Sequence, residues 1–465
     1  MTVSASTARR AAPVHGTRAR WDAGVRTGAA TTLWLGLLLV TYWWASDGGI
    51  QQLGSLGSGM LSLGRITGLV ASVLLLAQVI LMSRVPMLEQ AYGQHRLAQL
   101  HRLVGFTSVN LMMAHVVLIT WGYAGGSIAG FLSMLWMLTL TYPAVLLAVA
   151  GTIALLGVAV TSVKVARRNI RYESWHLLHL YAYLGVGLAL PHQLWTGIDF
   201  ISSPGRTLFW WSAWGGSVGA LLIWRIGGPV MLNLRHRLHV TSVVDEAPGI
   251  WSVYVTGKHM NELRVEAGQF FTWRFLGGPG WTRANPYSIS AAPDGHSLRF
   301  TVQGVGDGSH SSRRLRKGTP VIVEGPFGRL SPRARTRAKV AFIGAGVGVT
   351  PLRALAEAMP YRRGEAVYLE RYSDKPLFAK EIDKLAHERG LTVLRLKGPR
   401  RSANSWLPAS AGTAGDAYTL KYWVPDIAER DVYVCGPEGW TASVSRTLTR
   451  LGVPEDNIHT ETFAW

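Results

Sequence analysis

The chain has 465 residues, enough for two or three domains, and 48% of them are hydrophobic. Its formal net charge of +20 would suit nucleic acid or a membrane surface, so the location of the charge has to decide between them. The single cysteine, Cys435, excludes a disulfide within the chain and an iron–sulfur cluster held by four thiolates.

Apolar segments dominate the first half of the chain, and most are close to the ~20 residues that cross a bilayer. We expect six membrane spans, at roughly residues 30–45, 62–82, 102–121, 139–161, 177–195 and 207–224. The loops between them alternate between basic and nearly uncharged.

Basic loops mark the cytoplasmic side of a membrane protein. The Arg and Lys residues before the first span and after the second, fourth and sixth are Arg9, Arg10, Arg18, Arg20, Arg26, Arg84, Arg96, Arg102, Lys164, Arg167, Arg168, Arg171, Arg225, Arg235 and Arg237. We therefore expect a multi-pass plasma-membrane protein with both termini in the cytoplasm and a disordered tail over residues 1–28. The membrane accounts for the basic charge, so we expect no nucleic acid partner.

Histidines stand near both ends of the third and fifth spans. His101 and His115 are fourteen residues apart, which gives a rise of roughly 21 Å and a return to within ~40° of the same helix face. His179 and His192 are thirteen residues apart, so His101 should face His179 and His115 should face His192. Because neutral imidazole is an axial ligand of haem iron, these four residues are candidate ligands of two stacked haems.

Alternatives to this ligand set remain open. Membrane histidines also serve interhelical hydrogen bonds or proton relays. Thirteen steps on an ideal helix place His179 and His192 about 140° apart, and a kink at Pro191 would be needed to correct this. His176, one turn before His179, is the rival ligand.

The segments "LHRLVGFTSVNLMMAH", "TSVKVARRNIRYESWHLLH" and "LPH" resemble the ferric reductase-like transmembrane domain, which NADPH oxidases and ferric-chelate reductases of bacteria and other organisms share. The resemblance implies that residues 29–225 form a six-helix bundle. It also implies two b-type haems ligated from the third and fifth helices.

After Arg225 the chain becomes polar, and short β-patterned runs separated by Gly and Pro turns predict a small antiparallel barrel over residues 226–335. In "RANPYSIS", Tyr287 could stack on a flat ring and Ser288 could hydrogen-bond a ring nitrogen, although packing alone would also explain them. The turn in "GDGSHSSRRL" leads into a helix start that suits a pyrophosphate or an ordinary N-cap.

Residues 336–465 have an α/β pattern. "KVAFIGAGVGVTPLRAL" reads as a strand, a tight glycine turn and a helix, in which Gly344, Gly346 and Gly348 allow close approach to phosphates and Pro351 fits the first helical turn. A later strand ends in "CGP". We expect a Rossmann-like nucleotide-binding domain.

Residues 236–465 resemble the ferredoxin–NADP⁺ reductase superfamily through "NPYS", "GAGVGVTP", "CGP" and an aromatic terminus. The resemblance implies a six-stranded barrel that binds FAD and an α/β domain that binds NADPH or NADH. It assigns catalytic contacts to Tyr287, Ser288, Cys435 and Trp465. Further cofactor contacts fall on Arg283, Asn285, Pro286, Ser311 or Ser312, Gly344, Gly346, Gly348, Thr350, Pro351, Arg371, Ser373, Gly436 and Pro437.

One position departs from the superfamily. Asn285 stands where an arginine commonly pairs with the flavin phosphates, so Arg283 or Arg313 would have to substitute and FAD could be held loosely. For the nucleotide, Arg371 and Ser373, with Arg400 and Arg401, favour the 2′-phosphate of NADPH, whereas Glu370 would suit the 2′-hydroxyl of NADH.

Together these features predict a transmembrane oxidoreductase that takes electrons from cytoplasmic NAD(P)H, through FAD and two haems, to oxygen or ferric iron outside. The sparse positive charge of the outer loops favours oxygen. The alternatives are a haem-bearing subunit that feeds a separate periplasmic protein, and a transporter with a nucleotide-binding regulatory domain. The oligomeric state stays open.

Overall fold

The computed structural model describes residues 15–163, 172–277 and 281–462. Its contacts divide the chain into a helical unit, Val25–Gly228, and a second unit made of Met1–Gly24 with Pro229–Trp465, which we call the C-terminal unit. Seven of the residues named above lie outside the described residues, namely Arg9, Arg10, Lys164, Arg167, Arg168, Arg171 and Trp465.

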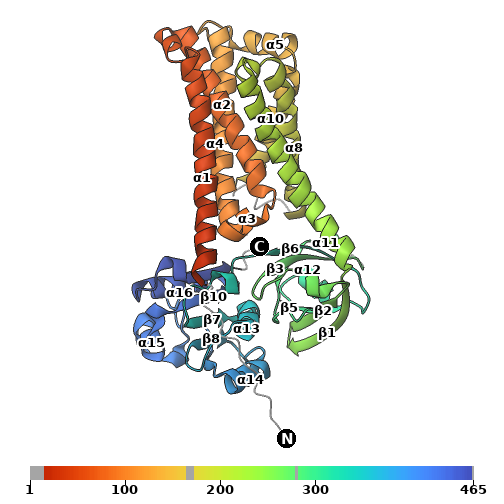
Figure 1. The fold of residues 1–465 in the computed structure, drawn as a ribbon, viewed down its shortest axis with the longest axis vertical. Helices are drawn as coiled ribbons and strands as arrows, with labels where there is room; N and C mark the ends of the chain where they lie inside the picture. The colour runs from red at the N-terminus through yellow and green to blue at the C-terminus, as the bar shows by residue number, and fades with distance from the viewer. Residues whose placement is uncertain (1–14, 164–171, 278–280, 463–465) are drawn as a thin grey trace. The chain divides into compact units, whose positions relative to one another are not determined.

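Long apolar helices run roughly side by side in the helical unit (Figure 1). They are α1 (His15–Ser46), α2 (Leu56–Met82), α3 (Pro86–Tyr92), α4 (Gln94–Tyr123), α5 (Phe131–Thr141), α6 (Val145–Ser162), α8 (Tyr172–Trp195), α9 (Ile198–Ile201) and α10 (Pro204–Ala220), with the short η1 (Gln51–Gly54) between α1 and α2. A π-helical stretch, η2 (Leu221–Gly227), continues α10 into α11 (Gly228–His236).

Among the described residues, 5 helices are long and apolar enough to cross a membrane: Arg20–Ser46, Leu56–Met82, Gln94–Tyr123, Val145–Ser162 and Pro204–His236. Helix α8 has 24 residues, long enough at ~1.5 Å per residue to span ~30 Å of hydrocarbon, but its histidines, Gln193 and Pro191 lower its hydropathy. The expected count of six spans is therefore not established by composition, and α8 remains a proposed span.

Two predicted boundaries are wrong. The span expected at 139–161 is interrupted, because α5 ends at Thr141, Pro143 cannot continue it, and α6 starts only at Val145. Residues 15–28, expected to be disordered, form the first turns of α1. Their alanines and arginines have high helix propensity, so the polar composition there does not prevent a helix.

Glycines let neighbouring helices approach closely. A Cβ on Gly64 of α2 would lie 2.8 Å from the Ile119 side chain of α4, and one on Gly151 of α6 would lie 2.6 Å from the Gly185 carbonyl oxygen of α8. Small residues at such positions bring backbones together in membrane bundles, where packing rather than hydrophobic burial drives association. Two tightly packed helix pairs, α2 with α4 and α6 with α8, result.

The C-terminal unit begins with six strands that pair as two antiparallel sheets. One sheet has the order β1 (His239–Ala247), β2 (Ile250–Thr256), β5 (Leu298–Gln303), and the other β4 (Asn285–Ser288), β3 (Phe270–Phe275), β6 (Val321–Phe327). Isolated bridges, such as Ile289 with Phe300, connect their edges. Six strands were expected, but no closed barrel is seen among the described residues, because the edges are joined only by these bridges and β4 is four residues long.

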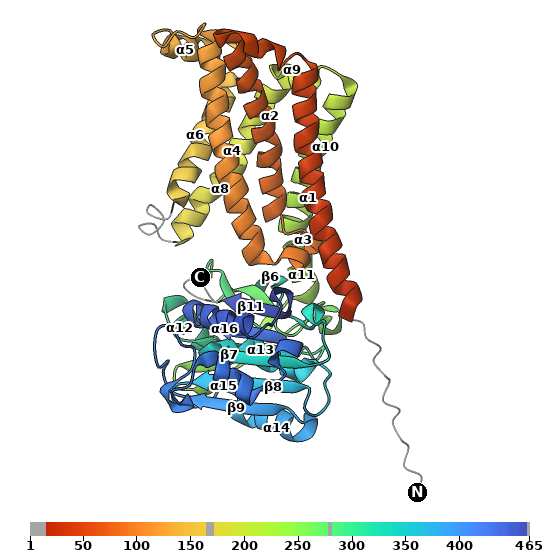
Figure 2. The ribbon, with the colours of Figure 1, turned by 90° about the vertical axis from the view of Figure 1, so that its left-hand side faces the viewer.

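A parallel sheet of five strands follows, in the order β11 (Ile458–Thr462), β10 (Asp431–Gly436), β7 (Val340–Ala345), β8 (Ala366–Tyr372), β9 (Thr392–Lys397). Figure 2 shows β11, β7, β8 and β9 in succession. Phe342 packs with the core of α13 (Val349–Ala358) and α14 (Ala379–Arg389), and the next residue, Ile343, with that of α15 (Asp416–Trp423) and α16 (Glu438–Arg450). Helices therefore cover both faces, as in a doubly wound nucleotide-binding fold.

The C-terminal unit contains its own hydrophobic cores, so we predict that residues 229–465 fold alone as a soluble fragment. The fragment loses the Asp22–Arg333 ion pair (2.6 Å), which costs about 1 kcal/mol or about 2–4 °C of thermal stability. A single cooperative thermal transition, followed by circular dichroism, is the expected result. A fragment that aggregates, or that melts without cooperativity, would contradict this division of the chain.

Candidate functional site

The four candidate histidines of the helical unit meet in two pairs. The ring centroids of His101 and His179 lie 5.9 Å apart, and those of His115 and His192 lie 6.4 Å apart. Two imidazoles that share one iron, with metal–nitrogen bonds of about 2 Å and ring centres about 1 Å behind each nitrogen, have centroids about 6 Å apart. Both pairs therefore fit axial ligation of a haem.

Hydrogen bonds through Nδ1 hold three of these rings. His115 Nδ1 lies 2.8 Å from the Gly64 carbonyl oxygen, so this nitrogen donates and Nε2 is left with a lone pair. His192 Nδ1 lies 2.6 Å from the Thr196 hydroxyl, and His179 Nδ1 lies 3.2 Å from the Ser162 hydroxyl. Metal-binding histidines usually hydrogen-bond through the nitrogen that does not bind the metal.

The end of α8 is held so that His192 faces α4. Pro191 lies inside the helix, and Gln193, two residues later, donates to the Ser72 hydroxyl (3.1 Å) and accepts from the Trp214 indole (3.1 Å). Ser72 belongs to α2 and Trp214 to α10, so two neighbours fix the turn that an ideal helix would misdirect. The His179 ring of α8 lies against the His101 ring, as expected for the proposed pair.

No group of three or more His, Cys, Asp or Glu side chains that could hold a metal ion occurs within the described ranges. Haem makes no such demand on the protein, because the porphyrin supplies the equatorial nitrogens and only two axial side chains are needed. The paired imidazoles fit this donor set and not that of a protein-bound zinc ion.

Gly68, one turn beyond Gly64, provides the space for His115. A Cβ on Gly68 would lie 2.5 Å from His115 Nδ1, so even alanine would push the imidazole away from its carbonyl partner. Gly64 and Gly68 together thus set the position of the His115 ring.

We predict that Gly68→Ala lowers the haem content of the purified protein by about half, because a displaced His115 cannot share an iron with His192. Haem per chain is measured by the pyridine haemochrome assay, together with the reduced-minus-oxidised spectrum. Gly157→Ala is the matched control, because a Cβ on Gly157 of α6 meets nothing within 4 Å. Equal haem content in both variants would refute the role of Gly68.

The flavin residues expected from "NPYS" lie on β4. Ser288 is buried, and its Oγ has no hydrogen-bond partner among the described residues. A hydroxyl that hydrogen-bonds a bound ligand fits this observation. The Tyr287 ring is stacked on Phe300 (5.3 Å, 7°) and partly exposed. Burial raises the pKa of Tyr287 to about 12, so the phenol stays neutral at physiological pH.

The neighbouring residues are tied to the turn that precedes β4. The Asn285 amide donates to the carbonyl oxygen of Arg283 (3.2 Å), and Pro286 is paired with Thr272 of β3. Arg313, the other proposed substitute, forms an exposed ion pair with Asp245 (3.0 Å). The Asn285 side chain therefore hydrogen-bonds the backbone of the preceding turn. Arg283 and Arg313 both lie outside β4.

The serines proposed for the pyrophosphate differ in their accessibility. Both belong to α12 (Asp307–Arg313). The Ser312 hydroxyl is buried, donates to the Ser309 carbonyl oxygen (2.7 Å) and accepts from the Trp251 indole (2.9 Å). Ser311 is partly exposed, so of the two it is the better placed to meet a ligand.

The glycine turn lies at the carboxyl ends of β7 and β10, where Gly344 pairs with Cys435. Gly346 has φ +57°, which a side chain would strain, and a Cβ on Gly348 would lie 2.7 Å from the Cα of Gly436. Strand order changes direction between β7 and β10, and ligands of doubly wound sheets bind in the crevice at such a point. The turn residues Thr350 and Pro351 begin α13, and Pro437 precedes α16.

Glu461, which was not predicted from the sequence, lies beside the carboxyl end of β10. It is the β11 partner of Cys435, whose thiol pKa is raised by burial and further by this carboxylate. A Cβ on Gly328 would lie 3.0 Å from Glu461 Oε2 and 3.2 Å from Phe270, the partner of Ser288. The residue is part of "ETFAW", where only the terminal Trp465, outside the described residues, was considered.

The residues proposed for the nucleotide ribose divide between the two faces of the sheet. Glu370 is buried in an ion pair with Arg395 (3.2 Å), and burial raises its pKa to about 7. Arg371 is partly exposed, and burial, with the nearby Arg400, lowers its pKa. Ser373 follows β8 and is exposed, so an anion could bind at Arg371 and Ser373 but not at Glu370.

The helical unit with its paired imidazoles, the two antiparallel sheets of β1–β6 and the doubly wound domain together indicate a membrane oxidoreductase. Residues 67–190 match the family model described as ferric reductase-like transmembrane component. The C-terminal part is 32% identical over 221 residues to ferredoxin–NADP reductase B of Sorangium cellulosum, covering 43% of this chain and 85% of that protein.

It is also 29% identical to a flavohemoprotein of Pseudomonas putida, over 44% of this chain and 52% of the relative, so the chain spans about half of that protein. It is 28% identical to the ferredoxin reductase component of a 3-ketosteroid-9-alpha-monooxygenase of Mycolicibacterium smegmatis, over 49% of this chain and 65% of that protein. The FAD/NAD-binding domain of a Vibrio cholerae nitric oxide dioxygenase matches with 25% identity over 49% of this chain and 99% of that chain, at a TM-score of 0.39.

The chain therefore has a C-terminal module that belongs to the ferredoxin–NADP reductase family, preceded by a multi-pass membrane part that matches the ferric reductase-like transmembrane component, and it is a membrane oxidoreductase.

Proposed function

We propose that the protein moves electrons from cytoplasmic NAD(P)H, by way of FAD and two b-type haems, to an acceptor on the opposite side of the membrane. The observation that carries this proposal is the meeting of His101 with His179 and of His115 with His192 at two levels of one helix bundle. When bound, FAD exchanges a hydride for single electrons, and each haem carries one electron at a time.

The residues of the chain would hold and align these groups. The two histidine pairs would hold the haem irons; the Gly64 carbonyl oxygen keeps the Nδ1–H tautomer of His115, and the hydroxyls of Thr196 and Ser162 hold the rings of His192 and His179 through Nδ1. In the C-terminal unit, Tyr287 and Ser288 would contact the flavin, while Gly344–Gly348 would receive the nucleotide phosphates. Cys435 would lie at the nicotinamide, and Trp465 would cover the flavin until the nicotinamide arrives.

The direction of transfer follows from the charge at the two ends of α4. Arg96 and Arg102 flank His101, whereas the loops nearest His115 contain few charges. By the positive-inside rule, the His101–His179 pair lies on the cytoplasmic side and both termini are cytoplasmic. Electrons from a cytoplasmic nucleotide would then reach the His115–His192 pair last.

The charges near the second pair favour a small neutral acceptor such as oxygen. Arg65, next to Gly64, is bound to Asp199 through both carboxylate oxygens (2.7 and 3.0 Å), and Arg206 is similarly bound to Asp47 (2.8 Å). These arginines are thus neutralised by their carboxylate partners, and neither is available to attract an anionic ferric chelate. Ferric iron is the competing acceptor.

The basic pair Arg371 and Arg400 favours NADPH over NADH. Arg371 donates to the Gly398 carbonyl oxygen (2.9 Å), and its Nε is buried without a partner among the described residues. Arg401, by contrast, is committed to Asp416 (2.5 Å). Two adjacent guanidinium groups without a carboxylate contact in the described part of the chain repel each other until an anion binds, and a 2′-phosphate would relieve this repulsion.

We predict that the purified protein in proteoliposomes oxidises NADPH added on the cytoplasmic side without any protein partner, and reduces oxygen faster than membrane-impermeant ferric chelates. Superoxide and ferrous iron on the opposite side are measured together with NADPH consumption. Activity that appears only with a separate acceptor protein would favour the alternative of a haem-bearing feeder subunit. Faster reduction of the ferric chelate would reverse the preference for oxygen.

Variants of His179 and His176 test the proposed assignment of the haem ligands. His179→Ala should remove one haem and abolish transmembrane transfer, while flavin reduction by NADPH continues, because the C-terminal unit has its own core. His176→Ala, one turn away, should retain both haems. If only the His176→Ala variant loses haem, His176 is the ligand and His179 is not.

We predict that Arg371→Gln raises the KM for NADPH about tenfold and leaves that for NADH unchanged, because a charge-assisted hydrogen bond contributes about 1.5–3 kcal/mol. Steady-state rates with both nucleotides and saturating FAD give the comparison. Arg401→Gln, which breaks the ion pair with Asp416, is the matched control. An equal change for NADH and NADPH would place the 2′-phosphate elsewhere.

A further inference from the structure

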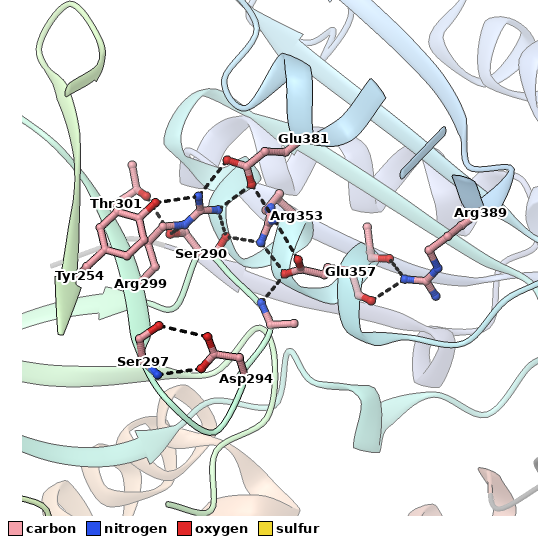
Figure 3. Close-up of polar contacts among 12 residues, drawn as sticks. Tyr254, Ser290, Asp294, Ser297, Arg299, Thr301, Arg353, Glu357, Glu381 and Arg389 are labelled. Atoms are coloured by element: carbon pink, nitrogen blue, oxygen red, sulfur yellow. Dashed lines mark hydrogen bonds and ion pairs between the residues drawn. The ribbon is translucent and has the colours of Figure 1, made fainter. Parts of the chain in front are cut away.

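One arginine of strand β5 contacts a helix of the nucleotide-binding domain. Arg299 of β5 is 5% exposed and donates to both carboxylate oxygens of Glu381 in α14 (2.9 and 3.0 Å) (Figure 3). On its own side it is held by the carbonyl oxygen (2.7 Å) and hydroxyl (3.2 Å) of Ser290. The guanidinium carbon also lies 4.8 Å from the centre of the Phe378 ring.

A second arginine extends the contact to α13. Arg353 binds Glu381 (2.6 Å) and Glu357 (2.5 Å), and it donates to the same Ser290 carbonyl oxygen (3.2 Å). Glu357 in turn accepts from the backbone N–H of Ala292 (2.6 Å), which follows β4. The cluster Arg299–Glu381–Arg353–Glu357, which we call the latch, thus joins the strand region β4–β5 to both helices.

The charges of the latch balance, and each depends on the others. Burial acts to raise the pKa of Glu381, but Arg299 and Arg353 outweigh it, so its pKa is lowered and it is ionised at neutral pH. Glu381 is the group that separates the two arginines, both of which are at least 93% buried. Without this carboxylate, two desolvated cations would face each other across the domain boundary.

Two residues of the latch, Arg353 and Glu357, belong to α13, the helix that follows the glycine turn. Arg353 comes one turn after Thr350, in α13, whose N-terminal end follows Gly344–Gly348. On the other side, Ser290 comes two residues after Ser288, the hydroxyl proposed to face the flavin. A shift of α13 relative to β4 would therefore move the bound nucleotide relative to the flavin, and hydride transfer requires reacting atoms about 3–3.5 Å apart.

We propose that the latch is a positioning device that holds α13 and α14 in register with β4 and β5, so that the nicotinamide of NADPH meets the flavin. The inference rests on the proposed reduction of flavin by NADPH, in which a hydride leaves the nicotinamide and NADP⁺ remains. Arg299, Arg353, Glu357 and Glu381 touch neither reacting ring and act through the backbone segments that they hold.

The test is Glu381→Gln in the full-length protein, saturated with FAD and mixed anaerobically with NADPH in a stopped-flow spectrometer. We expect flavin reduction to slow about tenfold, and the long-wavelength charge-transfer band between nicotinamide and flavin to weaken. The dissociation constants of NADPH and FAD should change less than about threefold, because the latch contacts neither ligand. Glu381→Asp, which keeps the charge, should recover most of the rate.

Asp426→Asn is the matched control, because Asp426 pairs with the buried Arg430 (2.7 Å) inside the nucleotide domain. An equal loss of rate in this control, or a Glu381→Gln variant that keeps both the rate and the charge-transfer band, would overturn the latch. If Glu381→Gln fails to fold, Arg299→Lys decides in its place, since it retains the charge but not the two-pronged contact. Absence of flavin reduction in the wild-type protein would instead refute the proposed function.

Discussion

An imidazole among hydrocarbon side chains needs a partner for its N–H, and the helical unit meets this need by bringing α2 against α4. The Gly64 carbonyl oxygen can accept from His115 only because Gly64 and Gly68 have no side chains to hold the helices apart. The close approach of α2 and α4 therefore determines both the tautomer of His115 and the direction of its Nε2. The pairing of His115 with His192 depends on it, as does any haem between them.

The helical periodicity of α4 was sufficient to predict which histidines meet, because fourteen residues return to nearly the same face. The same reasoning could not explain α8, where thirteen residues should misdirect His192. The correction comes from Gln193, whose amide is held by Ser72 and Trp214 on other helices. Contacts between segments 21 and 121 residues apart leave no periodic signal in one sequence.

In the C-terminal unit, the strand, glycine turn and helix around Gly344 followed from local patterns, and the structure places Gly344 beside Cys435 as a doubly wound sheet requires. The barrel predicted for β1–β6 is not closed among the described residues. Bridges between sheet edges depend on residues far apart in the chain, so local patterns could not show this. Glu461 was overlooked because one acidic residue in a short strand looks like an ordinary exposed position. Only its pairing with Cys435 shows otherwise. Likewise, Arg299 in β5 reads as a surface residue until Glu381 is brought opposite it.

The polar residues of α8 also bear on how the protein is made. A segment enters the bilayer from the translocation channel by partitioning, and each histidine, glutamine or proline reduces the free energy gained in lipid. α8 gains less than its neighbours, whereas α6, which packs against it at Gly151, is among the most apolar segments of the chain. Partner helices can retain a marginal segment by satisfying its polar groups. We infer that α8 becomes stable in the membrane as α2, α6 and α10 assemble around it, so its insertion depends on folding of the whole bundle.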